Sequence, residues 1–180
     1  MELEGGCACG AMRYRLTAPP LIVNACHCRD CQRLTGGAFA VNIWIERRFI
    51  EADHGRARSV MLTAGSGKPH EVFSCPDCGT ALWSKYHAAP GDTVLLRSGT
   101  LDRPEEVAPD VHIFTRSKRP WFELPAGVPA FETMYKLAEI WPEASRERLR
   151  RNIAGENQKE GARPPLNRPP SSRCCVEANS

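Results

Sequence analysis

The segment Cys75-Pro76-Asp77-Cys78-Gly79 decides most about the fold of this 180-residue chain. A turn of this composition brings both sulfurs to one centre, because the proline and the glycine suit a tight knuckle whose backbone N–H groups can hydrogen-bond the thiolates. The segment therefore predicts half of a zinc site. A redox pair of cysteines is the alternative, but no strand–helix–strand pattern surrounds the segment, and the glycine favours the zinc knuckle.

The other half of this site is predicted to come from the amino-terminal pair Cys7 and Cys9. Residues two apart in an extended chain point to the same face, so both sulfurs can approach one ion. Four sulfurs close the tetrahedron and leave no free position, which is typical of structural zinc. We therefore expect a structural zinc bound by Cys7, Cys9, Cys75 and Cys78, which ties the start of the chain to its middle and supports folding.

Three more cysteines, Cys26, Cys28 and Cys31, form a cluster of their own. The same alternation places Cys26 and Cys28 on one face, and a turn brings Cys31 round to them. His27 points the opposite way, so the fourth position is predicted to be open, as in a catalytic zinc site. The alternative is a second structural site completed by His27, by a distant histidine such as His112, or by a partner chain.

Composition favours a soluble protein of a reducing compartment. The hydrophobic fraction is 42%, no run approaches the ~18 apolar residues of a membrane span, and the start MELEGGCACG does not resemble a secretory signal. Nine cysteines in a reducing cytoplasm are more often metal ligands or reactive thiols than disulfides. Residues 1–140 carry 16 basic and 16 acidic side chains, which argues against nucleic-acid binding by this part of the chain.

Short apolar runs separated by turn residues predict a mainly antiparallel β domain over residues 1–140. The predicted strands are Met12–Leu16, Leu21–Ala25, Phe39–Ile45, Val60–Thr63, Glu71–Ser74, Ala81–Tyr86, Thr93–Ser98 and Val111–Thr115. Short helical turns are predicted at Arg29–Leu34 and within Pro129–Trp141.

Residues 141–180 are predicted to be a basic C-terminal extension, partly helical and then disordered. A short surface helix is expected through Arg146–Ile153, after the proline and acid of Pro142-Glu143. Gly161–Ser180 carries four prolines and almost no apolar residues, so it cannot offset the entropy of ordering. Cys174 and Cys175 fall in this tail and are interpreted as adventitious thiols.

The three cysteine clusters, in this order and spacing, resemble the glutathione-dependent formaldehyde-activating enzyme family, which is related to centromere protein V. The resemblance rests on Gly5–Gly10, Cys26–Cys31 and Phe73–Gly79, and on His112-Ile113-Phe114 followed by Pro120-Trp121. It implies an Mss4-like fold of coiled antiparallel β-sheets with zinc knuckles. It also implies two zinc ions per chain, with the Cys7/Cys9/Cys75/Cys78 site structural and the Cys26/Cys28/Cys31 site catalytic.

The resemblance further implies a carbon–sulfur lyase or synthase that acts on a small thiol adduct, such as S-hydroxymethylglutathione formed from formaldehyde and glutathione. A non-catalytic zinc-binding interaction module and a thiol-rich redox or metal-handling protein stay open as alternatives. Arg29, Arg33 and Arg97 are candidates to bind a carboxylate of glutathione, although arginines of small domains are more often solvated. Trp44 and Trp83 could line a pocket, but aromatic residues in strands more often belong to the core.

Overall fold

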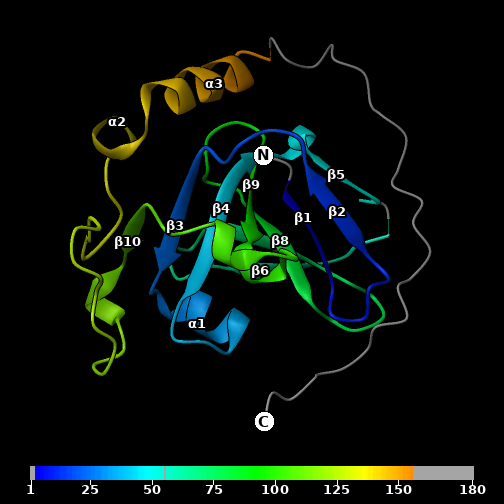
Figure 1. Cartoon of the computed structure of the whole chain (residues 1–180), viewed down its shortest axis with the longest axis horizontal. Helices are drawn as coiled ribbons and strands as arrows, with labels where there is room; N and C mark the ends of the chain where they lie inside the picture. The colour runs from blue at the N-terminus through cyan, green and yellow to red at the C-terminus, as the bar shows by residue number, and fades with distance from the viewer. Residues whose placement is uncertain (1–2, 55, 156–180) are drawn as a thin grey trace.

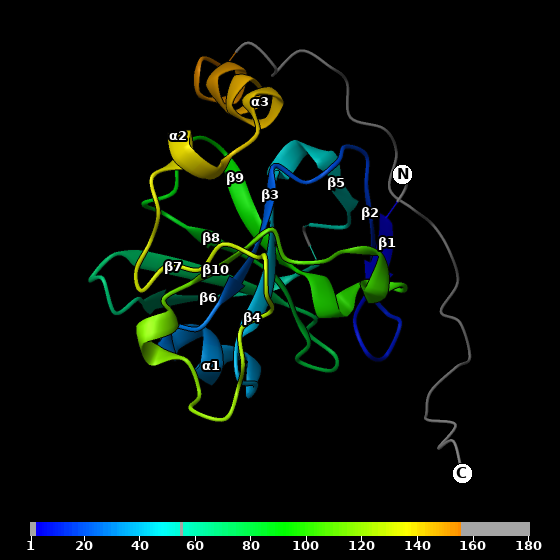
Figure 2. The same ribbon diagram turned by 60° about the vertical axis from the view of Figure 1, so that its left-hand side comes forward.

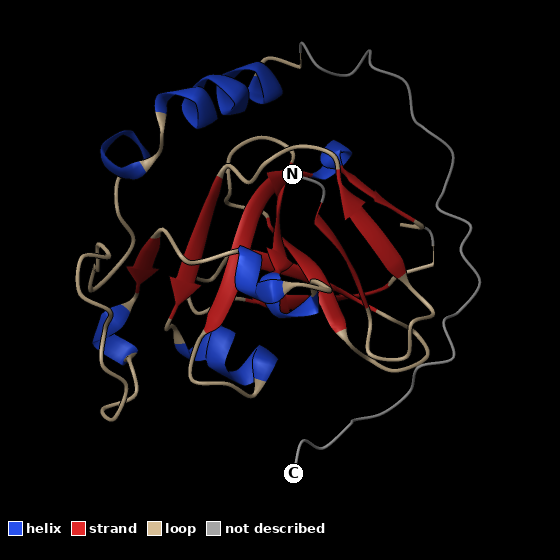
Figure 3. Ribbon diagram, in the orientation of Figure 1, coloured by secondary structure: helices blue, strands red, loops and turns tan. Residues whose placement is uncertain are grey.

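The computed structural model describes residues 3–54 and 56–155, which form two β-sheets with short helices at their margins (Figures 1 and 3). The smaller sheet is antiparallel, with the order β1-β2-β5. The larger sheet has seven strands in the order β10-β3-β4-β9-β8-β7-β6. The strands are β1 (Leu3–Gly6), β2 (Arg13–Leu16), β3 (Ile22–Cys26), β4 (Ala40–Glu46), β5 (Ile50–Ala52), β6 (Arg58–Thr63), β7 (Pro69–Ser74), β8 (Ala81–Tyr86), β9 (Thr93–Arg97) and β10 (Val111–Ile113).

The predicted mainly β fold is confirmed, with one difference in strand direction. Every strand expected from the sequence is present, and the pairs are antiparallel except for β10, which runs parallel to β3 with Ile113 opposite Cys26. The connection from β9 to β10 crosses to the smaller sheet, where Leu101 bridges to Gly5, and then returns beside β3. This detour lets two strands far apart in sequence run in the same direction. The short strands β1 and β5 were not predicted.

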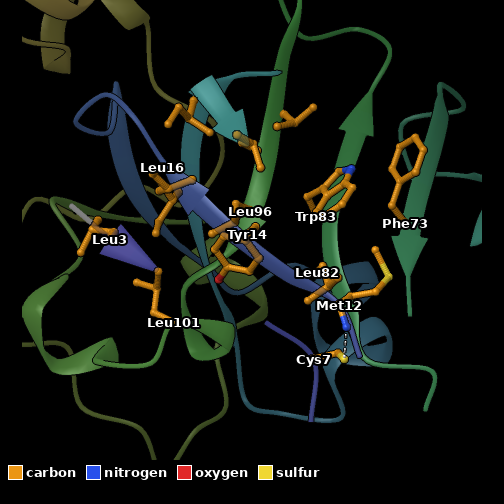
Figure 4. Close-up of a cluster of buried hydrophobic side chains, with 14 of the residues drawn as sticks. Leu3, Cys7, Met12, Tyr14, Leu16, Phe73, Leu82, Trp83, Leu96 and Leu101 are labelled. Atoms are coloured by element: carbon orange, nitrogen blue, oxygen red, sulfur yellow. Dashed lines mark hydrogen bonds between the residues drawn. The ribbon is translucent and has the colours of Figure 1, made fainter. Parts of the chain in front are cut away.

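Alternation along the strands divides the side chains of the larger sheet between two cores. The first core lies between the two sheets and includes Ile43, Ile45 and Leu96 from the larger sheet and Tyr14 and Leu16 from the smaller one (Figure 4). Each of these five side chains is at most 1% exposed. Burial of a large aliphatic or aromatic side chain contributes about 1.5–3 kcal/mol, so this core makes a large contribution to stability.

The opposite face of the larger sheet forms a second core with the helices. These are α1 (Arg29–Thr35), α2 (Leu137–Ile140) and α3 (Glu143–Ile153). Figures 1 and 2 show α1 at one end of β3 and β4, and α2 and α3 at the other. Trp44 packs edge-to-face on Trp141, and Leu149 of α3 belongs to the same cluster. Arg148 of α3 pairs with Glu46, whose side chain is fully buried.

Both tryptophans singled out in the sequence belong to cores, Trp83 to the first and Trp44 to the second. The helices predicted near Arg29–Leu34, within Pro129–Trp141 and at Arg146–Ile153 are confirmed as α1, α2 and α3. The segment predicted to be disordered, with Cys174 and Cys175, lies outside the described residues. The boundary at residue 140 stays a prediction. Within the described ranges, no helix combines the length and apolarity that a membrane crossing needs.

Strand β6 forms one edge of the larger sheet and, within the described part of the chain, pairs only with β7. Its six residues are all exposed, including the apolar side chains of Val60, Met61 and Leu62. The loop that joins β6 to β7 reaches the helix beside the cysteines, because Gly65 N donates to Asp30 Oδ2 of α1 at 2.7 Å. The hairpin therefore borders the region where Cys26, Cys28 and Cys31 lie.

Candidate metal centres

Four cysteines from two distant parts of the chain meet in what we call the four-cysteine cluster. The Sγ atoms of Cys7, Cys9, Cys75 and Cys78 all lie within 4.8 Å of one another. Cys9 Sγ lies 3.4 Å from Cys7 Sγ and 3.8 Å from Cys75 Sγ. Cys7 and Cys75 are buried, Cys9 and Cys78 are exposed, and all four are free thiols.

Tight turns place these four sulfurs. Gly79 N donates to Cys75 O at 2.9 Å, and Gly79 has φ +76°, a left-handed conformation that glycine adopts at little cost. On the amino-terminal side, Met12 N donates to Cys7 Sγ at 3.2 Å (Figure 4). The Thr80 hydroxyl lies 3.2 Å from Cys78 Sγ, and this hydrogen bond lowers the pKa of the Cys78 thiol to about 6.

The cluster fits a tetrahedral metal ion with sulfur ligands. Zinc–sulfur bonds of about 2.3 Å in a tetrahedron require sulfur–sulfur separations of about 3.8 Å. The separations of 3.4 and 3.8 Å lie close to that value. Backbone N–H donors to sulfur, such as Met12 N, are the hydrogen bonds expected around metal-bound thiolates. The four-cysteine cluster can therefore hold one metal ion with its coordination closed.

The remaining three cysteines lie at the junction of β3 and α1 and form the three-cysteine cluster. Cys26 is the last residue of β3, Cys28 caps α1, and Cys31 lies in the first turn of that helix. Their Sγ atoms lie within 4.8 Å of one another. Cys28 Sγ accepts a hydrogen bond from Cys31 N at 3.4 Å, which caps the helix and fixes the position of the Cys28 sulfur. Cys26 and Cys31 are buried, and Cys28 is half-buried.

Hydrogen bonds among the three thiols shift their pKa values. Hydrogen bonds from Cys26 and then from Cys31 lower the pKa of Cys28, whereas the bond to Cys28 raises the pKa of Cys26. Cys28 is also the most exposed of the three. Hydrogen bonds that favour a thiolate suit the binding of a metal cation, since metal ligation requires deprotonated sulfur.

His27, considered in the sequence as a fourth ligand, lies outside this group. Its ring is fully buried among Phe39, Phe122 and His112, and its Nε2 lies 2.9 Å from His112 Nδ1. Among the described residues, the group of candidate ligand atoms contains the three sulfurs and no histidine or carboxylate atom. Gln32 holds this segment in place, because its Nε2 donates to His27 O at 2.7 Å and to Ser117 O at 2.9 Å.

A buried polar pair lies beside the three-cysteine cluster, and sequence reasoning had considered only one of its two members, Arg97. Asn42 Nδ2 lies 3.9 Å from Cys31 Sγ, and Asn42 Oδ1 accepts a hydrogen bond from Arg97 Nη1. Asn42 interrupts the apolar run Phe39–Ile45, and a polar residue in a buried strand is the signal that could have pointed to it. Of the three arginines considered, Arg29 and Arg33 are exposed, whereas Arg97 is only 5% exposed.

Further polar atoms line the same face of the larger sheet. Arg97 lies two residues from Leu95, whose register partner is Ser84, and Ser84 in turn is paired with Val72. Ser84 Oγ and His70 Nε2 are buried without a hydrogen-bond partner among the described residues. Burial lowers the pKa of His70, and the charge of Arg97 lowers it further. The face beside the three-cysteine cluster thus presents several unsatisfied polar groups.

Comparison with known proteins identifies relatives of this chain. The family described as "Glutathione-dependent formaldehyde-activating enzyme" matches residues 2–117. A protein of Halomonas elongata, with a provisional description as a glutathione-dependent formaldehyde-activating enzyme, is 30% identical over 132 residues, which cover 69% of this chain and 82% of that protein. A crystal structure of a Rhodobacter sphaeroides protein matches with a TM-score of 0.43 and 17% identity, and covers 59% of this chain and 97% of that one.

Proposed function

This chain belongs to the family of glutathione-dependent formaldehyde-activating enzymes, and from that premise we propose that it is a zinc-dependent enzyme that makes or breaks a carbon–sulfur bond in a small thiol adduct. The reaction suggested by the family name is the condensation of formaldehyde with glutathione to S-hydroxymethylglutathione. In this proposal, Cys7, Cys9, Cys75 and Cys78 bind a structural zinc ion, and Cys26, Cys28 and Cys31 bind a catalytic one. The proposed compartment is the cytoplasm, where the thiols stay reduced.

The observation that carries the proposal is the difference between the two clusters. The four-cysteine cluster supplies a full tetrahedron, whereas the three-cysteine cluster supplies three sulfurs and, among the described residues, no fourth ligand atom. A zinc ion bound by three thiolates would leave one position for an exogenous thiol, promote its deprotonation near neutral pH and hold it beside an electrophilic carbonyl. The buried donors on the adjoining sheet face are polar groups that a substrate could contact.

The residues of the chain fix the geometry of this site. Cys28 and Cys31 are held by the cap of α1, and Gln32 ties the start of the helix to the segment around Ser117. Asn42 Nδ2 points to Cys31 Sγ and so can stabilise negative charge on that sulfur. Since these contacts join α1 to β4 and to the segment around Ser117, and Cys26 is the last residue of β3, the three sulfurs are held by packed elements rather than by a free loop.

The proposed reaction balances without an oxidant or a reductant. The thiol sulfur adds to the carbonyl carbon of formaldehyde, the carbon–sulfur bond forms as the π bond of the carbonyl breaks, and the proton lost by the thiol ends on the new hydroxyl oxygen. The reverse reaction returns that proton to the sulfur as the carbon–sulfur bond breaks. A site that favours the thiolate beside the carbonyl therefore serves both directions.

Native mass spectrometry and kinetics test this proposal together. Protein purified without chelators should carry two zinc ions, bind one glutathione and accelerate adduct formation from formaldehyde. The rate of adduct formation is measured by NMR. Cys28→Ser should retain one zinc ion and lose the acceleration, whereas Cys174→Ser, which alters a cysteine outside both clusters, should behave as wild type. Full acceleration by a Cys28→Ser protein with one zinc ion would refute the catalytic role. Two zinc ions without thiol binding would favour the non-catalytic module.

A further inference from the structure

Arg97 carries a buried charge that the protein satisfies only in part. The residue is 5% exposed, and its Nη1 donates to Asn42 Oδ1. Its Nε and Nη2 are buried and have no hydrogen-bond partner among the described residues. Unsatisfied donors on a buried guanidinium are costly, because the group has lost its water without gaining an acceptor. A donor edge of this kind indicates that an acceptor binds there.

The two unsatisfied donors lie on one edge of the guanidinium. In the planar group, the N–H of Nε and one N–H of Nη2 are parallel, whereas Nη1, which serves Asn42, lies on another edge. Two parallel N–H groups match the two oxygens of a carboxylate and form a bidentate pair with it. The free edge of Arg97 therefore has the shape of a carboxylate receptor.

Arg97 is among the residues that line a pocket with a volume of about 390 Å³. The pocket is lined by Leu34 and Thr35 at the end of α1, by the start of β4 at residues 39–41, by Ala81, and by residues 97–100. Arg97 is the charged residue among those that line it. The other lining residues are neutral and include the hydroxyl residues Thr35, Ser98 and Thr100, so the single guanidinium makes the pocket favour an anion over a cation or a neutral ligand.

The pocket adjoins the three-cysteine cluster on two sides. Thr35 Oγ1, at the lining, donates to Cys31 O at 2.8 Å, and Ala40, also at the lining, is the register partner of Cys26. Asn42 completes the connection, because it contacts both Arg97 and Cys31 Sγ. A molecule in the pocket could thus extend from the guanidinium toward the three sulfurs.

We propose that this pocket binds a carboxylate of the thiol substrate and that Arg97 recognises it through its Nε and Nη2 edge. The substrate class is then a thiol that carries a carboxylate, which includes glutathione and excludes simple neutral thiols as good ligands. The proposal rests on the proposed function, since it assumes that a thiol binds at the three-cysteine cluster. The competing role for Arg97 is that of a counter-charge to the thiolates alone.

Calorimetric titration of the zinc-loaded protein with glutathione and with glutathione diethyl ester, which lacks free carboxylates, separates these roles. Wild type should bind glutathione at least tenfold more tightly than the diester, because a charge-assisted bidentate pair is worth about one to two decades of affinity. Arg97→Gln should abolish that preference while it keeps two zinc ions by native mass spectrometry. Arg97→Lys should restore only part of it, because an ammonium cannot present two parallel N–H groups.

The matched control is Arg33→Gln, which removes an exposed arginine from α1 and should leave the preference unchanged. Equal affinity of wild type for glutathione and its diester would overturn the role of Arg97 while the proposed function stands. Absence of binding by both thiols would overturn the proposed function as well. Two results together would assign Arg97 to the counter-charge role. Arg97→Gln would lose zinc, and Arg97→Lys would keep the wild-type preference for glutathione over its diester. If Arg97→Gln does not fold, the wild-type comparison and Arg97→Lys still decide.

Discussion

Removal of one ligand from each cluster should affect stability unequally. Cys9 and Cys75 are 66 positions apart, so a metal ion in the four-cysteine cluster closes a long loop. By the loop-closure relation for cross-links, such a loop removes about 4 kcal/mol of chain entropy from the unfolded state, against about 2 kcal/mol for the span of the three-cysteine cluster. Since whole domains are stable by only about 5–15 kcal/mol, loss of the first link removes much of the total.

We therefore expect Cys75→Ser to lower the melting temperature by about 10–15 °C or to abolish a cooperative transition, and Cys28→Ser to lower it by about 5 °C. Cys75 is also 1% exposed within the first core, so the substitution places a hydroxyl among apolar side chains. The assay is thermal denaturation by circular dichroism, with zinc measured by mass spectrometry on the same samples. Equal losses in the two variants, or a larger loss in Cys28→Ser, would refute the division into a structural and an open cluster.

Three further predictions concern single residues. Arg148→Met should cost about 3–5 kcal/mol in urea denaturation, because it leaves Glu46 buried without its partner, whereas the exposed Arg151→Met should cost less than about 0.5 kcal/mol. Gly79→Ala should cost about 1–2 kcal/mol through its positive φ alone, since an added Cβ would meet nothing within 4 Å, and unchanged stability would contradict the turn geometry. Burial raises the pKa of Tyr14, so the stability contributed by its neutral phenol should be complete below pH 10 and fall as the pH rises further. Tyr14→Phe should flatten that decline, as measured by chemical denaturation from pH 9 to 12.

The positions of most strands along the chain were predictable because the strands of the two cores carry clear apolar runs. Ile22–Cys26 and Ala40–Glu46 are almost wholly buried, so their apolar character shows without knowledge of the partner strands. The cysteine spacing also predicted which sulfurs meet, since CxC and CxxC spacings each bring two sulfurs to one side. The structure brings together the same two groups of cysteines.

Other features depend on contacts between distant segments and could not be predicted. Ile50–Ala52 is too short for a periodic pattern, and it becomes a strand only because β2 offers it a partner. The parallel direction of β10 follows from the path of the chain after β9, which no local pattern encodes. Arg97 was one of three arginines considered for a substrate carboxylate, and no local pattern set it apart from the two that are exposed, because its burial follows from its register opposite Asn42.

The long separation between the halves of the four-cysteine cluster also affects synthesis. The ribosome adds roughly 5–20 residues per second, so the 66 positions between Cys9 and Cys75 correspond to roughly 3–13 s of translation. Throughout that interval the nascent amino terminus carries two thiols whose partners do not yet exist. A competing metal such as copper, or an oxidant, can capture the pair in that time. The amount of correctly metallated protein in a cell should therefore depend on the speed of translation and on the thiol redox state, as well as on the supply of zinc.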